Sequence, residues 1–412
     1  MKPEAPPAIA RGQSGINPWA RIFLPFALGY YLSYGLRTVN AVIAPDLSRE
    51  FALTASDLGL LTSAYFLTFG AFQIPLGILL DRYGARRVEA ALLALCAAGT
   101  ALFALASGFT ALILGRALIG LGVSACFMAS LKAFQQWFEP ARQPSLVGAI
   151  MVAGTLGALT VSTPLELALP AAGWRGVFWG LTAAAAAAAA WMLTVPEHRA
   201  GIALQPLAVQ LRGVAQIFAA PRFWRFAPQT CFVVGGFLAL QGLWAVPWLM
   251  AVAGLDRSAA AGHLALLNLA LLLGYLGVAL LSGRLARMGL SPTRLLTLGS
   301  GVSVGMLFLA ALNAGPAWLP WSALGLAMST GNLAYPLLSA GFPREMAGRA
   351  NTALNLAAFT GAFGIQWGFG VLVEAFGAGG ASQAESFRLA LAALAAGQLA
   401  AFLWFRAGTK RS

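Results

Sequence analysis

The sequence predicts an all-α membrane protein in which twelve transmembrane helices form two six-helix bundles. Hydrophobic residues make up 59% of the 412 residues, the mean hydropathy is +0.77, and only 9% of the residues are charged. A soluble domain carries about 25% charged residues, so this composition cannot supply a water-exposed surface. Apolar runs of about 20 residues recur along the whole chain, and one such run crosses a bilayer as a helix.

The apolar runs divide evenly around one long polar stretch. The expected spans of the first half are 20–44, 57–80, 88–107, 110–134, 144–168 and 174–194. The expected spans of the second half are 227–250, 259–282, 292–312, 318–340, 350–374 and 386–405. The predicted organisation is a disordered cytoplasmic tail at 1–18, an N-terminal bundle at 19–195, a cytoplasmic linker at 196–225, a C-terminal bundle at 226–405 and a cytoplasmic tail at 406–412.

The charge distribution predicts the orientation. The net charge is +13, and most of the 26 Lys and Arg residues fall in segments that share one side of the membrane with both termini. Basic loops stay in the cytoplasm, so both termini are expected there. The basic residues form no continuous stripe, which excludes nucleic acid as a partner. The richness in Ala, Gly, Leu and Arg is typical of a GC-rich bacterial genome and indicates a bacterial inner membrane.

The sequence contains no pattern of a metal site, a cofactor site or a catalytic centre. The three cysteines, Cys96, Cys126 and Cys231, each lie inside an apolar run without a Cys-x-x-Cys pair. Such cysteines are usually buried and inert. The expected partners are therefore the lipid bilayer and a small-molecule substrate, and the protein is not expected to be an enzyme.

The loop after the second span carries a Gly-x-x-x-Asp-Arg-x-Gly-x-Arg-Arg pattern. Its residues are Gly77, Asp81, Arg82, Gly84, Arg86 and Arg87. A degenerate copy at 283–289 follows the eighth span. Over residues 19–405, the pattern and the layout of six plus six spans resemble the major facilitator superfamily. The resemblance implies two bundles with pseudo-two-fold symmetry, a monomer that works by alternating access, and a conformational latch formed by the loop residues.

One face of the first span is polar. Tyr30, Tyr34 and Arg37 recur at helical spacing, and Asn40 flanks them. An Arg at the centre of a bilayer costs about 2.5–3.5 kcal/mol on insertion scales, so Arg37 is expected to face a cavity inside the protein. Every Asp and Glu falls in a loop or near the end of a span. A buried Arg without a buried acid needs an anion to neutralise it, which predicts an anionic substrate.

The first two spans also resemble one part of the superfamily. Arg37 followed by Pro45 is similar to the first helix of the organic-anion and organophosphate transporters, and Gln73-Ile74-Pro75-x-Gly77 is similar to the anion–cation symporters. The resemblance implies that Arg37 binds the substrate anion.

The fourth span carries an Arg-x-x-x-Gly-x-Gly run that begins at Arg116 and is similar to a fourth-helix motif of the superfamily. This places Arg116 with the conformational residues. In the anion–cation symporters a Glu that helps to carry protons stands seven residues after this Arg, where this chain has Val123. Coupling to protons and exchange of one anion for another therefore both remain open.

The second half is expected to supply the other wall of the substrate cavity, through Gln241, Trp244, Asn268 and Asn355. The predicted function is the transport of a small organic anion, such as a carboxylate or a sugar acid. One alternative is an exporter of amphipathic, drug-like compounds, which would suit the 26 Phe and 12 Trp residues and leave Arg37 with a structural role. A membrane sensor that has lost transport is another.

Overall fold

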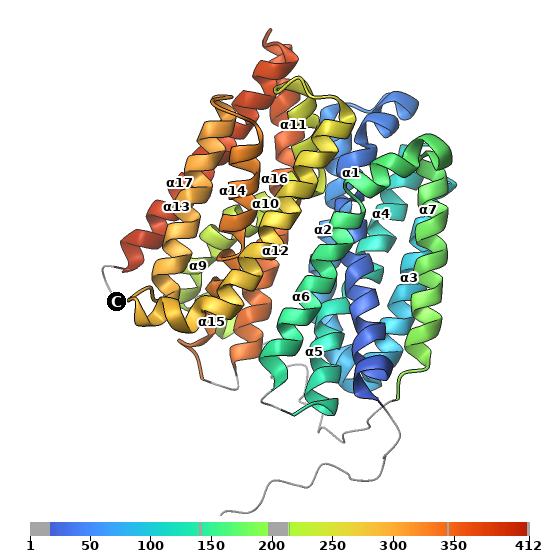
Figure 1. Ribbon diagram of the computed structural model, residues 1–412, viewed down its shortest axis with the longest axis vertical. Coiled ribbons are helices and arrows are strands. Elements are labelled where there is room, and N and C mark those ends of the chain that lie inside the picture. Colours follow the sequence, from blue (N-terminus) through green and yellow to red (C-terminus); the bar gives the residue numbers. More distant parts are fainter. Residues whose placement is uncertain (1–16, 140–141, 197–212, 214, 344–345, 410–412) are drawn as a thin grey trace, which may run out of the picture.

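The computed structural model shows two groups of helices side by side, one from each half of the chain (Figure 1). It describes residues 17–409 except 140–141, 197–212, 214 and 344–345. The described residues form α-helices with short π-helical and 3-10 turns, and no strand occurs among them. The helices of the first half, blue to green in Figure 1, lie together, as do those of the second half, yellow to red. The predicted all-α fold of two bundles is confirmed.

The first half contains seven α-helices in its described part, preceded by a π turn at Trp19–Phe23. They are α1 (Leu24–Phe51), α2 (Ala55–Tyr83), α3 (Ala85–Ala104), α4 (Phe109–Gly122), α5 (Cys126–Trp137), α6 (Gln143–Thr160) and α7 (Thr163–Leu193). Together α4 and α5 form the fourth expected span. The fifth span is interrupted after α6 and continues into α7, and Gly173 separates it from the sixth with a left-handed φ of 63°.

The second half begins with a helix that changes its winding several times. This seventh span comprises α9 (Pro221–Thr230), η3 (Cys231–Gly235), α10 (Gly236–Ala239), η4 (Leu240–Trp244) and α11 (Ala245–Ala251). The remaining elements are α12 (Arg257–Arg287), α13 (Pro292–Ala311), α14 (Trp318–Met328), η5 (Gly331–Leu333), α15 (Ala334–Ser339), α16 (Ala347–Ala378) and α17 (Gln383–Thr409). The elements from α14 to α15 form the tenth span.

The described helices extend past two of the expected boundaries. The helix α9 begins at Pro221, inside the expected linker 196–225, and α17 continues to Thr409, inside the expected tail 406–412. The tail 1–18, apart from its last two residues, and most of the linker lie outside the described residues. The differences arise because Arg and Pro at helix ends lower the hydropathy of a segment without ending its helix.

Eight of the described helices are long and apolar enough to cross a membrane, judged by length and composition alone. Among the other spans, polar residues dilute α1 and α2, α6 is a shorter apolar helix, and the tenth span is interrupted. Polar dilution and interruption are tolerated where a membrane helix faces other helices rather than lipid.

The two ends of the molecule are distinguished by their loops. We call the end at which α1 ends and α2 begins the α1–α2 end, and the opposite end the α2–α3 end. The charge distribution predicts that the α1–α2 end is external. The halves meet mainly where α2 packs along α16, with further contacts of α1 with η4 and of α12 with α6 and α7.

Small residues allow the helices of the first half to approach closely. Gly99 of α3 and Gly115 of α4 face each other, and a Cβ atom added at Gly99 would lie 2.8 Å from the backbone nitrogen of Ile119 and 3.0 Å from the carbonyl oxygen of Gly115. Backbone contact of this kind substitutes for the hydrophobic driving force that lipid does not provide between helices.

Gly99→Ala is expected to destabilise the protein by about 1–3 kcal/mol, because the backbone of α4 must move to accommodate the methyl group. The measurement is the thermal unfolding midpoint in detergent. Gly148→Ala in α6 is the matched control, since nothing lies within 4 Å of a Cβ atom there. Equal midpoints for the two variants would contradict this account of the α3–α4 contact.

Candidate functional site

Arg37 lies buried between the two halves, with 5% of its surface exposed. Its guanidinium carbon is 4.5 Å from the ring centre of Tyr34, 5.6 Å from that of Phe69 on α2 and 5.8 Å from that of Phe359 on α16. Ring faces attract a cation but do not replace its hydrogen bonds. The buried Nε of Arg37 has no acceptor, and no carboxylate of the described residues pairs with this side chain. The site is therefore a cation that lacks a counter-charge.

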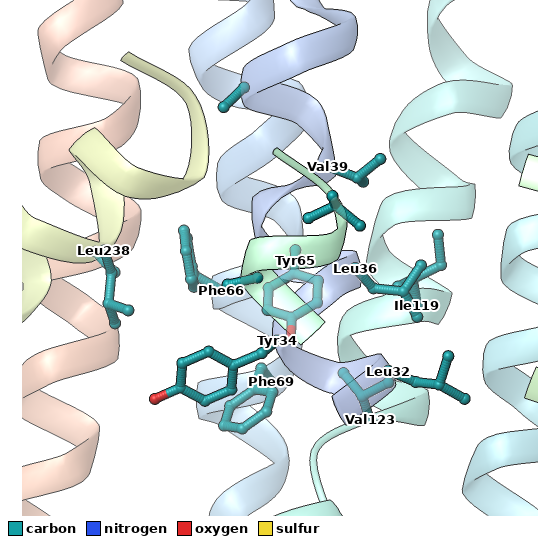
Figure 2. Packing of buried hydrophobic residues seen from close by; sticks show 14 of the residues in the cluster. Leu32, Tyr34, Leu36, Val39, Tyr65, Phe66, Phe69, Ile119, Val123 and Leu238 are labelled. Atoms are coloured by element: carbon teal, nitrogen blue, oxygen red, sulfur yellow. The ribbon is translucent and has the colours of Figure 1, made fainter. Parts of the chain in front are cut away.

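Tyrosines from both halves surround this cation. The rings of Tyr30 and Tyr34 on α1 are 5.1 Å apart. Figure 2 shows Tyr34 projecting from α1 with its hydroxyl directed away from Leu32 and Leu36. From the second half, Tyr275 of α12 and Tyr335 of α15 interact electrostatically with both Tyr34 and Arg37.

Amide side chains hold the two tyrosines of the second half. Asn332 donates from Nδ2 to the hydroxyl of Tyr275 at 3.0 Å, and the hydroxyl of Tyr335 donates to Oδ1 of Asn355 at 3.0 Å. Asn355 is expected at the substrate site, and in the structure it accepts the hydrogen bond of the Tyr335 hydroxyl, a group that interacts electrostatically with Arg37.

The fourth and tenth spans are interrupted at corresponding positions of the two halves. Residues 123–125 separate α4 from α5, and residues 329–333 separate α14 from α15. In transporters, interrupted helices at matching positions of the two halves mark the substrate region, because the freed backbone groups line a cavity. The second interruption contains Asn332 and is followed at once by Tyr335. The sequence analysis did not predict these breaks.

Gln241 and Asn268 form a hydrogen-bonded chain that crosses between the halves. Gln241 donates from Nε2 to Oδ1 of Asn268 at 2.6 Å, and Asn268 donates from Nδ2 to the hydroxyl of Ser162 at 3.1 Å. Ser162 lies in the first half, between α6 and α7. The expected pair is thus brought together, and it joins the seventh, eighth and fifth spans.

Trp244 and Asn40 make packing contacts away from the Arg37 cation. Trp244 donates from Nε1 to the carbonyl oxygen of Gln366 at 2.9 Å and stacks on Phe369 at 4.9 Å. Asn40 donates from Nδ2 to the hydroxyl of Thr62 on α2 at 3.0 Å. Asn40 thus connects two helices of its own half, whereas the Trp244 ring also lies beside Gly59 of α2, where an added Cβ atom would be 3.3 Å from it.

Arg116 is completely buried in α4 and fixes the backbone beside Arg37. Its Nη1 donates to the carbonyl oxygen of Leu36 at 2.8 Å, and its guanidinium carbon lies 5.1 Å from the ring centre of Tyr65. Tyr65 also interacts electrostatically with Arg37, so one ring separates two guanidinium groups. This arrangement raises the positive potential around the site.

The loop residues with the expected latch role lie at the α2–α3 end. Gly84 has a φ of 84°, a left-handed conformation that favours glycine, and it joins α2 to α3. Arg86 donates from Nη1 to the carbonyl oxygen of Val195 at 3.1 Å, and Arg82 lies over the ring of Tyr83. Gly77 and Arg87 are exposed, and the side chain of Asp81 lies outside the described part of the chain.

The sequence analysis missed several groups at or near the site. Phe69 and Phe359 gave no signal, because apolar residues dominate every span. Glu89 lies near the end of its span, as expected, but the sequence analysis did not predict its burial: it is 0% exposed in α3, and it makes no pair with Arg37. In the sequence, the position of Glu89 just inside the expected third span is what could have indicated its burial. No group of three or more metal-ligating side chains occurs among the described residues.

Comparison with known proteins identifies relatives that are named as transporters. The chain is 30% identical over 151 residues to a probable sulfoacetate transporter of Cupriavidus necator, a match that covers 37% of this chain and 35% of that protein. It is 29% identical over 164 residues to a probable L-galactonate transporter of Escherichia coli, with 40% and 36% covered. The matched stretch thus spans about a third of the length of these relatives.

Solved structures share the fold. A bacterial homologue of the human lysosomal transporter Spinster, in an inward-facing and unoccupied conformation, superposes with a TM-score of 0.75 at 20% identity, over 95% of this chain and 97% of that one. A D-xylose–proton symporter gives a TM-score of 0.75 at 18% identity, over 94% and 97% of the two chains. At these identities the likeness concerns the fold.

The family itself is settled by a match over most of the chain. The model of the Major Facilitator Superfamily matches residues 26–366, which include the site around Arg37 and the interrupted spans of both halves. The two bundles, the membrane-spanning helices and the relatives agree with this match. The chain belongs to the major facilitator superfamily.

Proposed function

We propose that this protein is a transporter that carries a small organic anion, such as a carboxylate or a sugar acid, across the inner membrane of a bacterium. The observation that supports this most is Arg37, a buried cation between the two halves that has no carboxylate partner in the described structure. A buried, uncompensated charge is strongly unfavourable, and a bound anion would relieve it. The relatives named for sulfoacetate, galactonate, hexuronate and galacturonate support the same class of substrate.

The groups around Arg37 suit a polyhydroxylated acid. A planar guanidinium binds a carboxylate or a sulfonate through two parallel hydrogen bonds. The hydroxyls of Tyr30, Tyr34, Tyr275 and Tyr335 would then meet the hydroxyl groups of the substrate. Gln241 and Asn268 would shape the cavity from the second half, and Asn355 would act by orienting Tyr335. Trp244 and Asn40 would support the walls.

The proposed mechanism is alternating access, and an ion-pair cluster at the α1–α2 end supplies one gate. Arg257 of α12 contacts both carboxylate oxygens of Asp46 on α1, at 2.5 and 3.1 Å, and its Nε lies 2.8 Å from Oε2 of Glu166 on α7. Arg257 also donates to the carbonyl oxygen of Val42 at 2.9 Å. The cluster joins the second half to the first, so it would have to break before this end could open.

The opposite end would carry the second gate. We propose that Gly77, Asp81, Arg82, Gly84, Arg86 and Arg87 form the latch of the alternative conformation, and that Arg116 transmits changes at the site to α1 through the backbone of Leu36. The positive-inside distribution supports a cytoplasmic position for the α2–α3 end and for both termini. The protein would work as a monomer, with protons or a second anion as the driving species.

Arg37→Gln is expected to abolish stabilisation by substrate, because the glutamine amide carries no charge. The measurement is thermal unfolding of the detergent-purified protein with galacturonate, galactonate, sulfoacetate, neutral galactose and a lipophilic cation. An anion at 100 times its Kd stabilises the wild type by about 2.7 kcal/mol. Arg175→Gln is the control, since Arg175 pairs with Glu50 at the α1–α2 end, within the first half.

Two results would count against an organic-anion transporter with Arg37 at its site. One is equal stabilisation of the wild type and of Arg37→Gln by the same anion, which would place the anion elsewhere. The other is stabilisation of both forms by the lipophilic cation alone, which would favour an exporter of amphipathic compounds.

Arg257→Gln is expected to open the α1–α2 end more often. Loss of about 1.4 kcal/mol from the closed state would raise the open population about tenfold. The measurement is labelling by a membrane-impermeant maleimide of Gly242→Cys, in a chain without its native cysteines. A Cβ atom at Gly242 would lie 3.4 Å from the carbonyl oxygen of Arg37, at the interface between the halves.

Arg175→Gln is again the matched control, because its ion pair with Glu50 lies within one half and should not restrain the opening. A labelling rate in Arg257→Gln no higher than in Arg175→Gln would show that the cluster is not a gate.

A further inference from the structure

Glu89 is a buried acid in the first half that the proposed substrate site does not use. It lies in the second turn of α3, its side chain is 0% exposed, and its carboxyl oxygens have no polar partner among the described residues except the weakly hydrogen-bonding thiol of Cys126. It fills the space beside Gly29 of α1, where an added Cβ atom would overlap Oε1 of Glu89 and lie 3.7 Å from Sγ of Cys126 on α5. The carboxyl group thus occupies a contact between three helices of one bundle.

No cation compensates this carboxyl group from its own helix or from α4. One turn before it, Arg86 is directed to the carbonyl oxygen of Val195, and Arg87 is exposed. Arg116 of α4 donates to Leu36 on α1. Cys96, two turns further along α3, is the only other titratable side chain of α3 past Glu89.

The described side chains of the other neighbouring helices supply no counter-charge either. The thiol of Cys126 on α5 is the polar neighbour of the carboxyl group, and Lys132 further along α5 donates to the carbonyl oxygen of Leu80. On α2, Arg82 is exposed, and the side chain of Asp81 lies outside the described residues. The last four turns of α7 carry no charged residue, and Arg21, before α1, is exposed.

An ionised carboxylate in these surroundings would be far less stable than a neutral one. Burial removes its hydration, and no cation takes the place of the lost water. The carboxyl group therefore holds its proton in this conformation. It can release the proton when the helices around it part and admit water. A group that binds a proton in one conformation and releases it in another is the element that couples a proton to transport.

A water-sized cavity lies about one turn away from Glu89 along the helices. Its volume is about 10 Å³, it lies between the ends of α1, α3, α5 and α7, and Phe26, Arg86, Ala133 and Val195 are among its lining residues. This is about the space of one water molecule. Phe26 and Arg86 stand one turn before Gly29 and Glu89 on their helices, so the cavity lies between the carboxyl group and the α2–α3 end.

The carboxyl group also contacts the elements that carry the substrate site. Cys126 is the first residue of α5, directly after the interruption of the fourth span, and Phe127 packs on Tyr30 with 5.3 Å between ring centres. Tyr30 follows Gly29 on α1. A movement of α1 against α5 would therefore change the environment of Glu89 and the position of Tyr30 together.

We propose that Glu89 is the proton-carrying residue of this transporter, and that its protonation is coupled to the movement of α1 against α5. The step is a simple ionisation, in which the O–H bond of the carboxylic acid breaks and the proton passes to water at the α2–α3 end. This inference rests on the proposed function, because it names the residue that would couple protons to anion transport.

The first test is independent of the substrate. Infrared difference spectra of the purified protein, recorded between neutral and alkaline pH, should contain the carbonyl stretch of a protonated carboxylic acid at neutral pH. The band should disappear in Glu89→Gln and persist in Glu50→Gln, a change of an exposed acid. If the wild type and Glu89→Gln give the same carboxyl bands, Glu89 is not protonated and the proposal fails.

The second test uses proteoliposomes with D-galacturonate as the probe. With an inward proton gradient, Glu89→Gln should accumulate galacturonate at least tenfold less than the wild type. Exchange of internal for external galacturonate, which needs no net proton movement, should stay within about twofold. Glu50→Gln should match the wild type in both assays, and binding is checked by thermal stabilisation.

Accumulation by Glu89→Gln at the wild-type level would overturn the assignment, as would a wild type that exchanges galacturonate but ignores the proton gradient. These outcomes are distinct from failure of the proposed function. In that case the wild type would show no anion-dependent stabilisation that requires Arg37, while the infrared test would still report on Glu89.

Discussion

The burial of an arginine without a counter-charge is the constraint on which the centre of this structure depends. Arg37 sits where the two halves meet, held by the faces of Tyr34, Phe69 and Phe359. Rings stabilise a cation without neutralising it. The site is therefore electrostatically incomplete, and Arg116 on the other side of Tyr65 adds to its positive potential. In the proposed function, an anion that enters between the halves would complete it.

Interrupted helices allow such a site to exist inside a membrane. Backbone groups must be satisfied in a bilayer, so a break in a helix persists only where protein or a cavity supplies partners. In the fourth span Gln73 donates to the carbonyl oxygen of Ser124 at 3.1 Å. In the tenth span, Asn332 lies in the interruption and donates to the hydroxyl of Tyr275. Tyr335, just after the interruption, donates to Asn355. The breaks thus bring polar side chains to the interface between the halves.

The ion-pair cluster near the α1–α2 end and Glu89 in the first bundle differ in how their charge is compensated. Near the α1–α2 end, Asp46, Glu166 and Arg257 compensate one another across the halves, so their separation is reversible when water enters. Glu89 lacks such compensation and is buried among helices of one bundle. Entry of water at the α1–α2 end would separate the ion pairs, and entry of water around Glu89 would let the acid release its proton.

The sequence alone determined the membrane class, the two halves and the place of Arg37, because composition, apolar runs and helical spacing are local properties of a chain. Tertiary structure decided what each polar residue faces. Helical spacing places Asn40 on the face of Arg37, yet Asn40 bonds to Thr62, and Trp244 packs against Phe369 and the backbone of Gly59 on α2. Phe69, Phe359 and the bridge from Asn268 to Ser162 join residues far apart in the chain. Glu89 looked like an end residue, and only the packing of α1 and α5 against α3 shows it buried.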